Sequence, residues 1–367
     1  MLSVAGAQTG VDKELTVTYL TNQLPFPPYS GGQLREAETL RRLCDHAHID
    51  FFAATDHFDR DAAAIADTAA FCRSVTVAEG GACDPDPHAE LPDRVRRHWA
   101  PRLPAALAAH LRATAVDVVH VEGYFLMGHV PPDVDVPILL VEENIEYTLH
   151  RLEQEVLRAP PGGVPWQRTR ALELEAWRRA SVCGAVTDDD AARIRTAVPG
   201  RRVVTLFPGS DHLERELAAE RAEATQPPPS PSVLYVGNLS WGPSRDAALY
   251  LVHEIWPRIR AAVDDATLVV AGAGSSAELD ALAEADDRVV LTGPVPSIAP
   301  YVSAADVVIC PIRFGGGVKA KLLESVRAGR AVVSSSLGAR GIPAPLLEAV
   351  VVADGAAALA DRTVELL

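Results

Sequence analysis

Short apolar segments recur along the whole chain, and most of them are separated by segments with helical periodicity. Each is predominantly apolar and most are rich in β-branched residues, which is typical of strands covered on both faces. In the first half, strands are expected at residues 15–20, 49–54, 74–78, 116–121, 138–141, 185–187 and 203–206. In the second half, they are expected at residues 233–236, 268–271, 289–292, 307–309, 331–334 and 350–352.

Amphipathic segments fill the intervals between these strands. The predicted helices include residues 33–47, 103–112, 166–179, 246–262 and 319–328. Strands that alternate with helices indicate an α/β fold of doubly wound parallel sheets, with helices on both faces. The first fourteen residues show no period and are expected to form a loose tail.

A proline-rich segment, residues 226–232, interrupts this alternation once. Such a segment continues neither a helix nor a central strand, so it predicts a linker or an exposed loop. The expected domains are therefore residues 1–207 and 208–367. Because ligands bind at the carboxyl ends of strands in such sheets, a cleft between the two halves is the expected site.

Composition narrows the function classes. The chain has 367 residues, with 34 basic and 49 acidic side chains and a formal net charge of −15. This acidity argues against a nucleic-acid partner and against docking on an anionic membrane. No apolar run approaches the ~20 residues of a membrane span. Five scattered cysteines indicate reduced thiols, so a soluble cytoplasmic protein is expected.

The most informative stretch, residues 310–334, runs from a strand through three glycines into a helix and then into another strand. Its candidate residues are Arg313, Gly315, Gly316, Gly317, Lys319, Lys321 and Glu324. Glycines let backbone amides approach a ligand, and a helix N-terminus attracts an anion. Lysines in a first helical turn oppose the helix dipole unless an anion lies among them. The alternative is a glycine turn with surface lysines and an intrahelical Lys321–Glu324 pair.

This stretch resembles the donor-site motif of retaining nucleotide-sugar-dependent glycosyltransferases of the GT-B fold, in glycosyltransferase family four. The resemblance implies two Rossmann-like domains, an acceptor-binding domain at residues 1–207 and a donor-binding domain at residues 208–367. Further similar segments in the second half are residues 235–246, 270–274, 290–295, 301–306 and 338–341. Those in the first half are residues 30–32 with Arg35, residues 143–146 and residues 181–190.

The resemblance also implies roles for individual residues. Glu324 would hold the nucleotide ribose, and Arg313 and Lys321 would contact the diphosphate during catalysis. The implied donor-binding set is Gly31, Gly32, Trp241, Thr292, Gly293, Val295, Gly315, Gly316, Gly317, Lys319 and Glu324. On the acceptor side, Glu122 and His120 are the catalytic candidates and Glu143 is the candidate acceptor-binding residue.

The chain departs from the family pattern at three points. Many relatives carry a glutamate eight positions before the ribose-binding one, where this chain has Gly316. Many also carry a basic residue in the loop matching residues 237–241, and this chain has none there. Relatives usually continue beyond the position of Leu367 into a helix that returns to the first domain.

Two other motifs have simpler explanations than a cofactor or metal site. The glycines of residues 272–274 fit a dinucleotide fingerprint, but the next strand ends at Gly293 without the required acidic residue. The three aspartates at 188–190 could imitate a metal site, but an acidic helix start, with an aspartate as N-cap, accounts for them. We therefore expect no metal and no cofactor.

The expected function is transfer of a sugar from a nucleotide-diphosphate sugar to an acceptor hydroxyl or other nucleophile. Fixed cations and amides would stabilise the leaving diphosphate, so no metal is expected, and the resemblance implies retention. The acidic surface favours a soluble small-molecule acceptor, such as a natural product, and the composition suggests a bacterial source. The alternatives are a sugar-nucleotide epimerase of the same fold, a cell-envelope polysaccharide transferase, and a catalytically idle nucleotide-sugar-binding partner.

Overall fold

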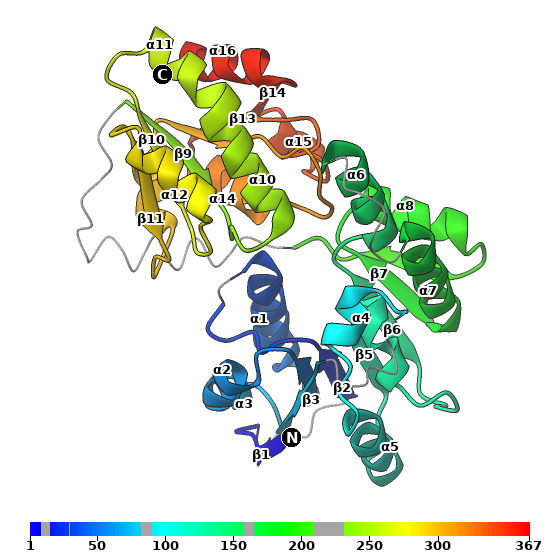
Figure 1. The fold of residues 1–367 in the computed structure, drawn as a ribbon. Helices are drawn as coiled ribbons and strands as arrows, with labels where there is room; N and C mark the ends of the chain where they lie inside the picture. Colours follow the sequence, from blue (N-terminus) through cyan, green and yellow to red (C-terminus); the bar gives the residue numbers. More distant parts are fainter. Residues whose placement is uncertain (9–14, 29, 82–89, 158–164, 209–230) are drawn as a thin grey trace. The chain divides into compact units, whose positions relative to one another are not determined.

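The computed structural model describes residues 1–8, 15–28, 30–81, 90–157, 165–208 and 231–367, and the remaining residues are not described. The chain forms two compact units, Met1–Phe207 and Pro208–Leu367 (Figure 1). No helix in the described ranges is both long and apolar enough to cross a membrane.

The first unit is built on one sheet, whose described strands number eight and lie in the order β1-β4-β3-β2-β5-β6-β7-β8. β1 is antiparallel to β4, and every other neighbouring pair is parallel. The strands are β1 (Leu2–Ala5), β2 (Leu15–Thr21), β3 (Ala47–Thr55), β4 (Ser74–Glu79), β5 (Val118–Glu122), β6 (Ile138–Glu142), β7 (Val182–Ala185) and β8 (Arg202–Thr205).

Helices pack against both faces of this sheet. They are α1 (Gly31–Leu43), α2 (Phe58–Ala63), α3 (Ile65–Ala69), α4 (Asp93–Arg97), α5 (Leu103–Ala113), the 3₁₀ helix η1 (Tyr124–His129), α6 (Glu146–Leu157), α7 (Trp166–Arg179) and α8 (Asp188–Ala197). Because successive strand residues face opposite ways, Tyr19 enters the core that contains Leu40 of α1, whereas Leu20 enters the core that contains Trp177 of α7. Strands buried on both faces explain the continuously apolar segments of the sequence.

The order of strands reverses between β2 and β5. The chain passes from β2 to β3 and β4 on one side, and then returns to β5 on the other side of β2. Crossover connections are right-handed, so this reversal moves the helices from one face of the sheet to the other. Outside the carboxyl ends of the two strands at such a reversal, a parallel sheet leaves a crevice in which ligands bind.

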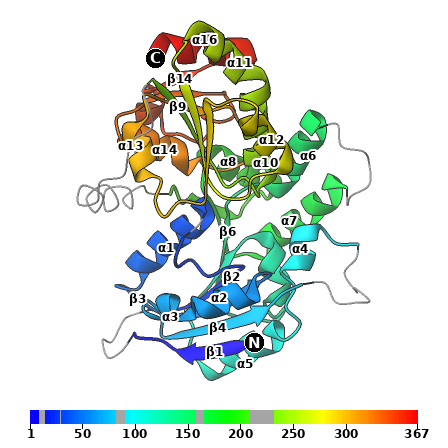
Figure 2. The ribbon, with the colours of Figure 1, turned by 60° about the vertical axis from the view of Figure 1, so that its left-hand side comes forward.

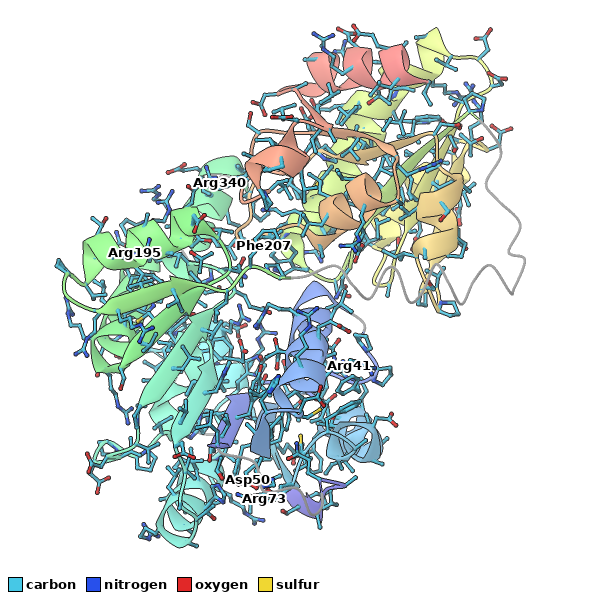
Figure 3. The ribbon with its side chains drawn as sticks, turned by 180° about the vertical axis from the view of Figure 1, so that it is seen from behind. Arg41, Asp50, Arg73, Arg195, Phe207 and Arg340 are labelled. Atoms are coloured by element: carbon cyan, nitrogen blue, oxygen red, sulfur yellow. The ribbon has the colours of Figure 1, made fainter. Side chains whose placement is uncertain are left out.

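The amino end of the same sheet is closed by an ion pair between Asp50 of β3 and Arg73, which precedes β4 (Figure 3). Asp50 also accepts a hydrogen bond of 2.7 Å from the Ser74 hydroxyl. Burial opposes ionisation of this carboxyl, but the hydrogen bonds from Arg73 and Ser74 lower its pKa. This end of the sheet is thus stabilised by its own charges.

The second unit contains a parallel sheet whose described strands number six, in the order β11-β10-β9-β12-β13-β14. The strands are β9 (Ser232–Val236), β10 (Thr267–Ala271), β11 (Val289–Gly293), β12 (Val307–Cys310), β13 (Ala331–Ser334) and β14 (Val350–Val352). The helices are α10 (Gly242–Tyr250), the π-helix η2 (Leu251–Ile255), α11 (Trp256–Ala262), α12 (Ala277–Glu284), α13 (Ala299–Ala304), α14 (Ala320–Arg327), α15 (Ala344–Leu347) and α16 (Ala356–Leu366).

The strand order of this unit reverses between β9 and β12. Helices α10 and α12 therefore cover one face of the sheet, and α13 and α14 cover the other (Figure 2). The expected α/β fold with doubly wound parallel sheets is thus confirmed in both units. As in the first unit, the crevice is expected outside the carboxyl ends of the two strands at the reversal.

The structure corrects four local predictions. Residues 2–5 of the expected loose tail form β1, which pairs with β4. Helix α1 ends at Leu43, because the chain from Ala47 onward is already in β3. β7 ends at Ala185, earlier than predicted, and Thr187 begins α8 as its N-cap. The predicted helix at 246–262 begins at Gly242 and widens into η2 just before Pro257, which lacks the N–H for a regular helical bond. The predicted linker lies almost wholly outside the described residues.

Gly272, which follows β10, tests how tightly the loops of the second unit pack. It has a φ of +143°, and a Cβ placed there would lie 1.9 Å from the Gly237 carbonyl oxygen. We expect Gly272→Ala to lower the free energy of unfolding by about 3 kcal/mol or more, from strain and clash together. Denaturant unfolding measures this loss.

Gly329→Ala is the matched control, since Gly329 has a φ of +69° and nothing lies within 4 Å of its added Cβ. We expect it to cost only about 1 kcal/mol, from backbone strain alone. Equal losses in the two variants would contradict the close approach of the loops.

Candidate active site

The loops at the carboxyl edge of the second sheet are hydrogen-bonded to one another. The loop after β9 lies against the loop after β10, with Gly237 N–H donating to Ala271 O at 3.0 Å and Leu239 N–H to Ala273 O at 2.7 Å. The loop after β10 reaches that after β11, because Gly272 N–H donates to Gly293 O at 3.3 Å. Loops remote in sequence thus form one continuous edge.

The glycine loop (residues 315–317) lies between β12 and α14, beside the strand reversal. Gly315 and Gly317 have φ values of +147° and +61°, which residues other than glycine rarely adopt. The preceding Phe314 is fully buried and anchors the loop. A Cβ on Gly315 would lie 3.9 Å from the Trp241 ring, so Trp241, 39% exposed, borders the glycine loop from the β9 side.

Two lysines stand at the start of α14. Lys319 is buried, and its Nζ donates to the carbonyl oxygens of Gly316 and Gly317 at 3.2 and 3.0 Å. Lys321 Nζ donates to Val236 O at 2.6 Å and to the Tyr235 hydroxyl at 3.3 Å, and it lies 4.4 Å from the centre of the Tyr235 ring. The sequence therefore places one cation at the glycine loop and the other at the end of β9, and backbone oxygens offset their repulsion by the helix dipole.

Lys321 is charged at neutral pH. Burial by itself lowers the pKa of its ammonium, but its interactions with Tyr235, including the hydrogen bond, raise that pKa above the ordinary value. The contact also ties α14 to the end of β9, although the two are far apart in the sequence. A positive charge is thereby fixed at the strand reversal.

Arg313 is held differently from the two lysines. Its guanidinium makes a two-pronged ion pair with Asp246 of α10, with Nε–Oδ2 and Nη2–Oδ1 distances of 3.0 and 2.5 Å, and lies over the Tyr250 ring. The hydrogen bond to Asp246 raises the pKa of Arg313. The predicted diphosphate contact therefore comes with a carboxylate that neutralises it, a partner that sequence reasoning missed.

The other predicted donor residues of the second unit lie on the same edge of the sheet or beside it. Glu324 is buried on α14, one helical turn after Lys321. Thr292 and Gly293 end β11, where Thr292 Oγ1 donates to Gly293 O at 2.8 Å, and Val295 follows half-buried. Gly31 and Gly32 belong to the first unit, where they begin α1.

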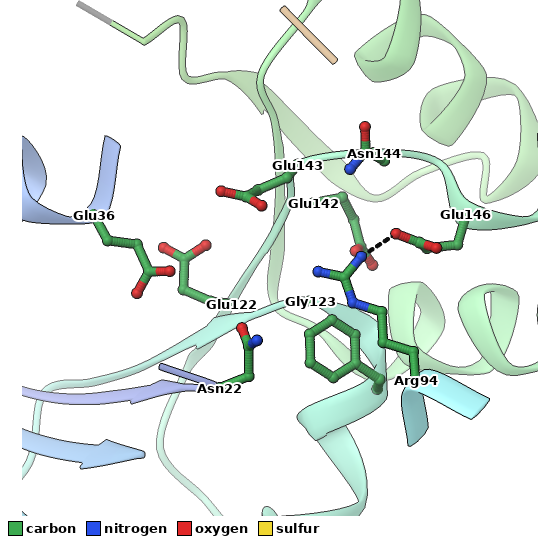
Figure 4. A pocket seen from close by; sticks show the side chains of 10 residues that line it. Asn22, Glu36, Arg94, Glu122, Gly123, Glu142, Glu143, Asn144 and Glu146 are labelled. Carbon is green, nitrogen blue, oxygen red and sulfur yellow. Dashed lines mark hydrogen bonds and ion pairs between the residues drawn. The ribbon is translucent and has the colours of Figure 1, made fainter. Parts of the chain in front are cut away.

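The first unit contains a pocket at its own strand reversal (Figure 4). It lies where β2, β5 and β6 end, and it is rich in carboxyl groups. Its lining residues are Asn22, Glu36, Arg94, Glu122, Gly123, Phe125, Glu142, Glu143, Asn144 and Glu146. Two of the predicted acceptor-side residues, Glu122 and Glu143, thus come together in one pocket.

Arg35 of α1 holds these two carboxylates. Its guanidinium lies 2.5 Å from Glu122 Oε2 and 3.1 Å from Glu143 Oε1, and its side chain is only 10% exposed. Gly32 lies beside this cluster, since a Cβ there would lie 2.8 Å from Glu143 Oε1 and would displace the end of that side chain. The family resemblance includes Arg35 with the glycine pair of residues 31 and 32. Nothing in the sequence predicts its ion pairs with Glu122 and Glu143, which are far from it along the chain.

Glu122 has two further partners. The Tyr19 hydroxyl donates to Glu122 Oε1 at 2.5 Å, and His120 Nε2 lies 2.7 Å from the same oxygen. The His120 ring stacks on Tyr19 with ring centres 4.3 Å apart. Burial opposes ionisation of Glu122, but Arg35 and His120 lower its pKa well below the usual range. Glu122 is thus a fixed anion, and His120 supports it from behind the pocket.

The remaining wall of the pocket was not predicted from the sequence. Glu142 ends β6 and accepts hydrogen bonds from Trp177 Nε1 and Tyr124 N–H, while Arg94 pairs with Glu146 and lies over Phe125. Burial raises the pKa of Glu142 to about 8. Glu142 and Asn22 each stand at the end of a strand, a signal that could have suggested them. Arg94 carries no such signal.

The three aspartates at 188–190 begin α8, as the simpler explanation predicted, although the N-cap is Thr187 rather than an aspartate. Thr187 Oγ1 accepts from Asp190 N–H at 3.0 Å, and Thr205 Oγ1 donates to Asp188 Oδ1 at 2.5 Å. Across the described ranges, no cluster of three or more His, Cys, Asp or Glu side chains is placed to hold a metal ion.

Comparison with known proteins agrees with these features. Residues 230–367 match a family described as glycosyl transferases group 1. No protein of curated function matches the chain. Sucrose-phosphate synthase of Thermosynechococcus elongatus shares 16% identity at a TM-score of 0.64, over 95% of this chain and 88% of that one. HepE of Anabaena, in complex with UDP-glucose, shares 14% identity at a TM-score of 0.61, over 95% of this chain and 89% of that one.

The two parallel-sheet units, in the architecture that these structures share with this chain, define the GT-B fold. The second unit carries a glycosyl transferases group 1 domain, and the glycine loop, both lysines and Glu324 lie within the matched residues.

Replacement of Arg35 tests the charge cluster of the first unit. Arg35→Met keeps most of the apolar stem but leaves two carboxylates without their cation. We expect a loss of about 3–5 kcal/mol in the free energy of unfolding at neutral pH. The lowered pKa of Glu122 stabilises the fold above the ordinary value of 4.5, and this contribution is lost as pH falls through the folded-state pKa. The difference from wild type should therefore shrink in acid.

Arg41→Met on the same helix is the control, because Arg41 is 46% exposed and lies 3.7 Å from Glu38. It should cost no more than about 1 kcal/mol. Urea titrations over a range of pH values measure both variants, and a loss for Arg35→Met that is small or constant with pH contradicts the cluster.

Proposed function

We propose that the protein is a retaining glycosyltransferase of family four, which transfers a sugar from a nucleotide-diphosphate sugar to an acceptor hydroxyl or other nucleophile. The proposal rests on one observation. The residues that match the glycosyl transferases group 1 family place a glycine loop, two cationic side chains and a buried glutamate at the strand reversal of their sheet. Structures of the same fold include one with bound UDP-glucose.

In this proposal the second unit binds the donor. The glycine loop (Gly315, Gly316 and Gly317) brings backbone close to the diphosphate, and Lys319 and Lys321 supply positive charge at the N-terminus of α14. Glu324 accepts hydrogen bonds from the ribose hydroxyls. The donor-binding set of this unit also includes Thr292, Gly293, Val295 and Trp241. The role of Gly31 and Gly32, which begin α1 of the first unit, stays a prediction of the family resemblance.

Charge develops on the diphosphate as the bond between the anomeric carbon and the phosphate oxygen breaks. A buried ammonium such as that of Lys321 stabilises this charge strongly because it is already in place and poorly screened. Arg313 contributes when its bond to Asp246 is loosened by the incoming anion. Fixed cations of this kind make a metal unnecessary, and we propose that the reaction proceeds without one.

The pocket of the first unit is proposed to bind the acceptor. Glu143 is 28% exposed and can orient a hydroxyl, while Glu122 and His120 form the rigid support behind it. A nucleophile that reaches the anomeric carbon on the face from which the diphosphate departs gives retention. The net charge of −15 favours a soluble small-molecule acceptor, and the scattered cysteines favour a cytoplasmic location.

Donor binding is tested by thermal melting with UDP, GDP, dTDP, ADP and NAD, each with and without EDTA. One nucleoside diphosphate at 100 times its Kd should stabilise the protein by about 2.7 kcal/mol, with or without EDTA. Glu324→Gln and Lys321→Met should each abolish most of this shift. Glu284→Gln, an exposed glutamate on α12, is the control that keeps it.

The outcomes separate the alternatives. Stabilisation by NAD alone, or only in the presence of a metal, contradicts the proposed donor site. A shift that survives both Glu324→Gln and Lys321→Met places the nucleotide elsewhere. No shift with any nucleotide contradicts the proposed donor site, whether the protein is an enzyme or an idle nucleotide-sugar-binding partner.

The reaction is tested with the sugar nucleotide whose diphosphate stabilises the protein. Without an acceptor, water replaces the nucleophile, and proton NMR identifies the first anomer released. An α-linked donor should give the α-anomer first, at a rate that EDTA leaves unchanged. Early release of the β-anomer contradicts retention, and accumulation of an epimerised sugar nucleotide indicates an epimerase.

A further inference from the structure

Glu36 of α1 is a buried carboxyl group with one unused oxygen. The residue is 1% exposed, and its Oε1 accepts a hydrogen bond of 2.8 Å from Gln23 Nε2. Its Oε2 is buried and has no hydrogen-bond partner in the described part of the chain. Glu36 lines the pocket of the first unit, and its carboxyl group points toward Glu122 (Figure 4).

We propose that Glu36 Oε2 is an additional binding atom of this pocket, which donates a hydrogen bond to an oxygen of a hydroxylated ligand. Buried polar atoms are nearly always paired, so an unpaired one that faces a pocket points to a partner that arrives with a ligand. Neither sequence pattern nor family resemblance marked this residue. That the ligand is the sugar acceptor rests on the proposed function, whereas the binding itself does not.

The charges around Glu36 decide which form of the carboxyl is present. Burial and the anions Glu122 and Glu143 raise its pKa to about 8, against the opposing effects of Arg35 and Gln23. Three further ionisable residues line the same pocket, Arg94, Glu142 and Glu146. At neutral pH, Glu36 is therefore mainly a neutral acid. Because Oε1 already accepts from Gln23, the proton belongs on Oε2, which makes this oxygen a donor.

A hydroxylated ligand matches the donor and the acceptor that the pocket offers. Glu143 Oε1 is occupied by Arg35, but its carboxylate is 28% exposed and can accept a further hydrogen bond. A ligand hydroxyl can accept from Glu36, and the same or a neighbouring hydroxyl can donate to Glu143. This alternation suits vicinal hydroxyls of a sugar or cyclic polyol better than an anion, which the surrounding carboxylates would repel.

The test uses the full-length protein and two probes, methyl α-D-glucopyranoside and myo-inositol, titrated by NMR at about pH 6 and about pH 10. These values bracket the Glu36 pKa of about 8. Wild type should bind at least one probe about tenfold more weakly at the higher pH, because a deprotonated Glu36 no longer donates. E36Q, whose amide donates at either pH, should show a clearly smaller change between them, because only Glu142, with a pKa of about 8, still titrates in this range.

Glu38→Gln on the same helix is the matched control and should keep the wild-type pH dependence. An infrared spectrum provides a second readout that needs no ligand. Wild type at neutral pH should show the bands of buried protonated carboxyl groups, and the difference spectrum between wild type and E36Q should contain the one that belongs to Glu36, while that of Glu142 remains. A melting temperature for E36Q close to that of wild type shows that the pocket is intact.

Three results would each overturn the proposal. They are failure of both probes to bind, equal pH dependence in wild type and E36Q, and a difference spectrum between wild type and E36Q that contains no band of a protonated carboxyl group. The nucleotide melting experiment depends on residues of the other unit. If it succeeds while these tests fail, only the role of Glu36 is refuted, and the reverse pattern refutes the donor site alone.

Discussion

The hydrogen bonds of the Lys321 ammonium hold together the strand reversal of the second unit. Its hydrogen bond to the Val236 carbonyl, the last of β9, comes from α14, the helix that follows β12. Because β9 and β12 are the two neighbouring strands at the strand reversal, this bond connects them there. The glycine loop between β12 and α14 is thereby held against the end of β9. A buried cation at this point costs free energy unless it is hydrogen-bonded, and the Tyr235 hydroxyl and the Val236 carbonyl meet that need.

In the first unit, an arginine makes the contacts across the strand reversal. Arg35 lies on the helix after β2 and binds carboxylates at the ends of β5 and β6, across the strand reversal. Its partners are anions where those of Lys321 are neutral. The pocket of the first unit is thus acidic, whereas the strand reversal of the second unit carries cations. This difference is the basis for proposing an acceptor in the former and a diphosphate in the latter.

Much of the fold could be predicted from the sequence, because strands buried on both faces are apolar throughout and the glycine loop is conspicuous. β1 escaped prediction because a four-residue antiparallel edge strand has no distinctive period. The partners of Arg313 and Lys321 could not be predicted, since they depend on which strands become neighbours. The role of Glu36 could not be predicted for the same reason, because its raised pKa depends on burial and on the anions that the fold places near it.

Hydrogen–deuterium exchange with and without the stabilising nucleoside diphosphate tests the central claim most directly, namely that the donor binds at the strand reversal of the second unit. Binding should slow exchange at residues 313–324 and in the loop at residues 237–241, and Glu324→Gln should remove both effects. Protection confined to other segments, or binding without any protection of the glycine loop, would contradict the account.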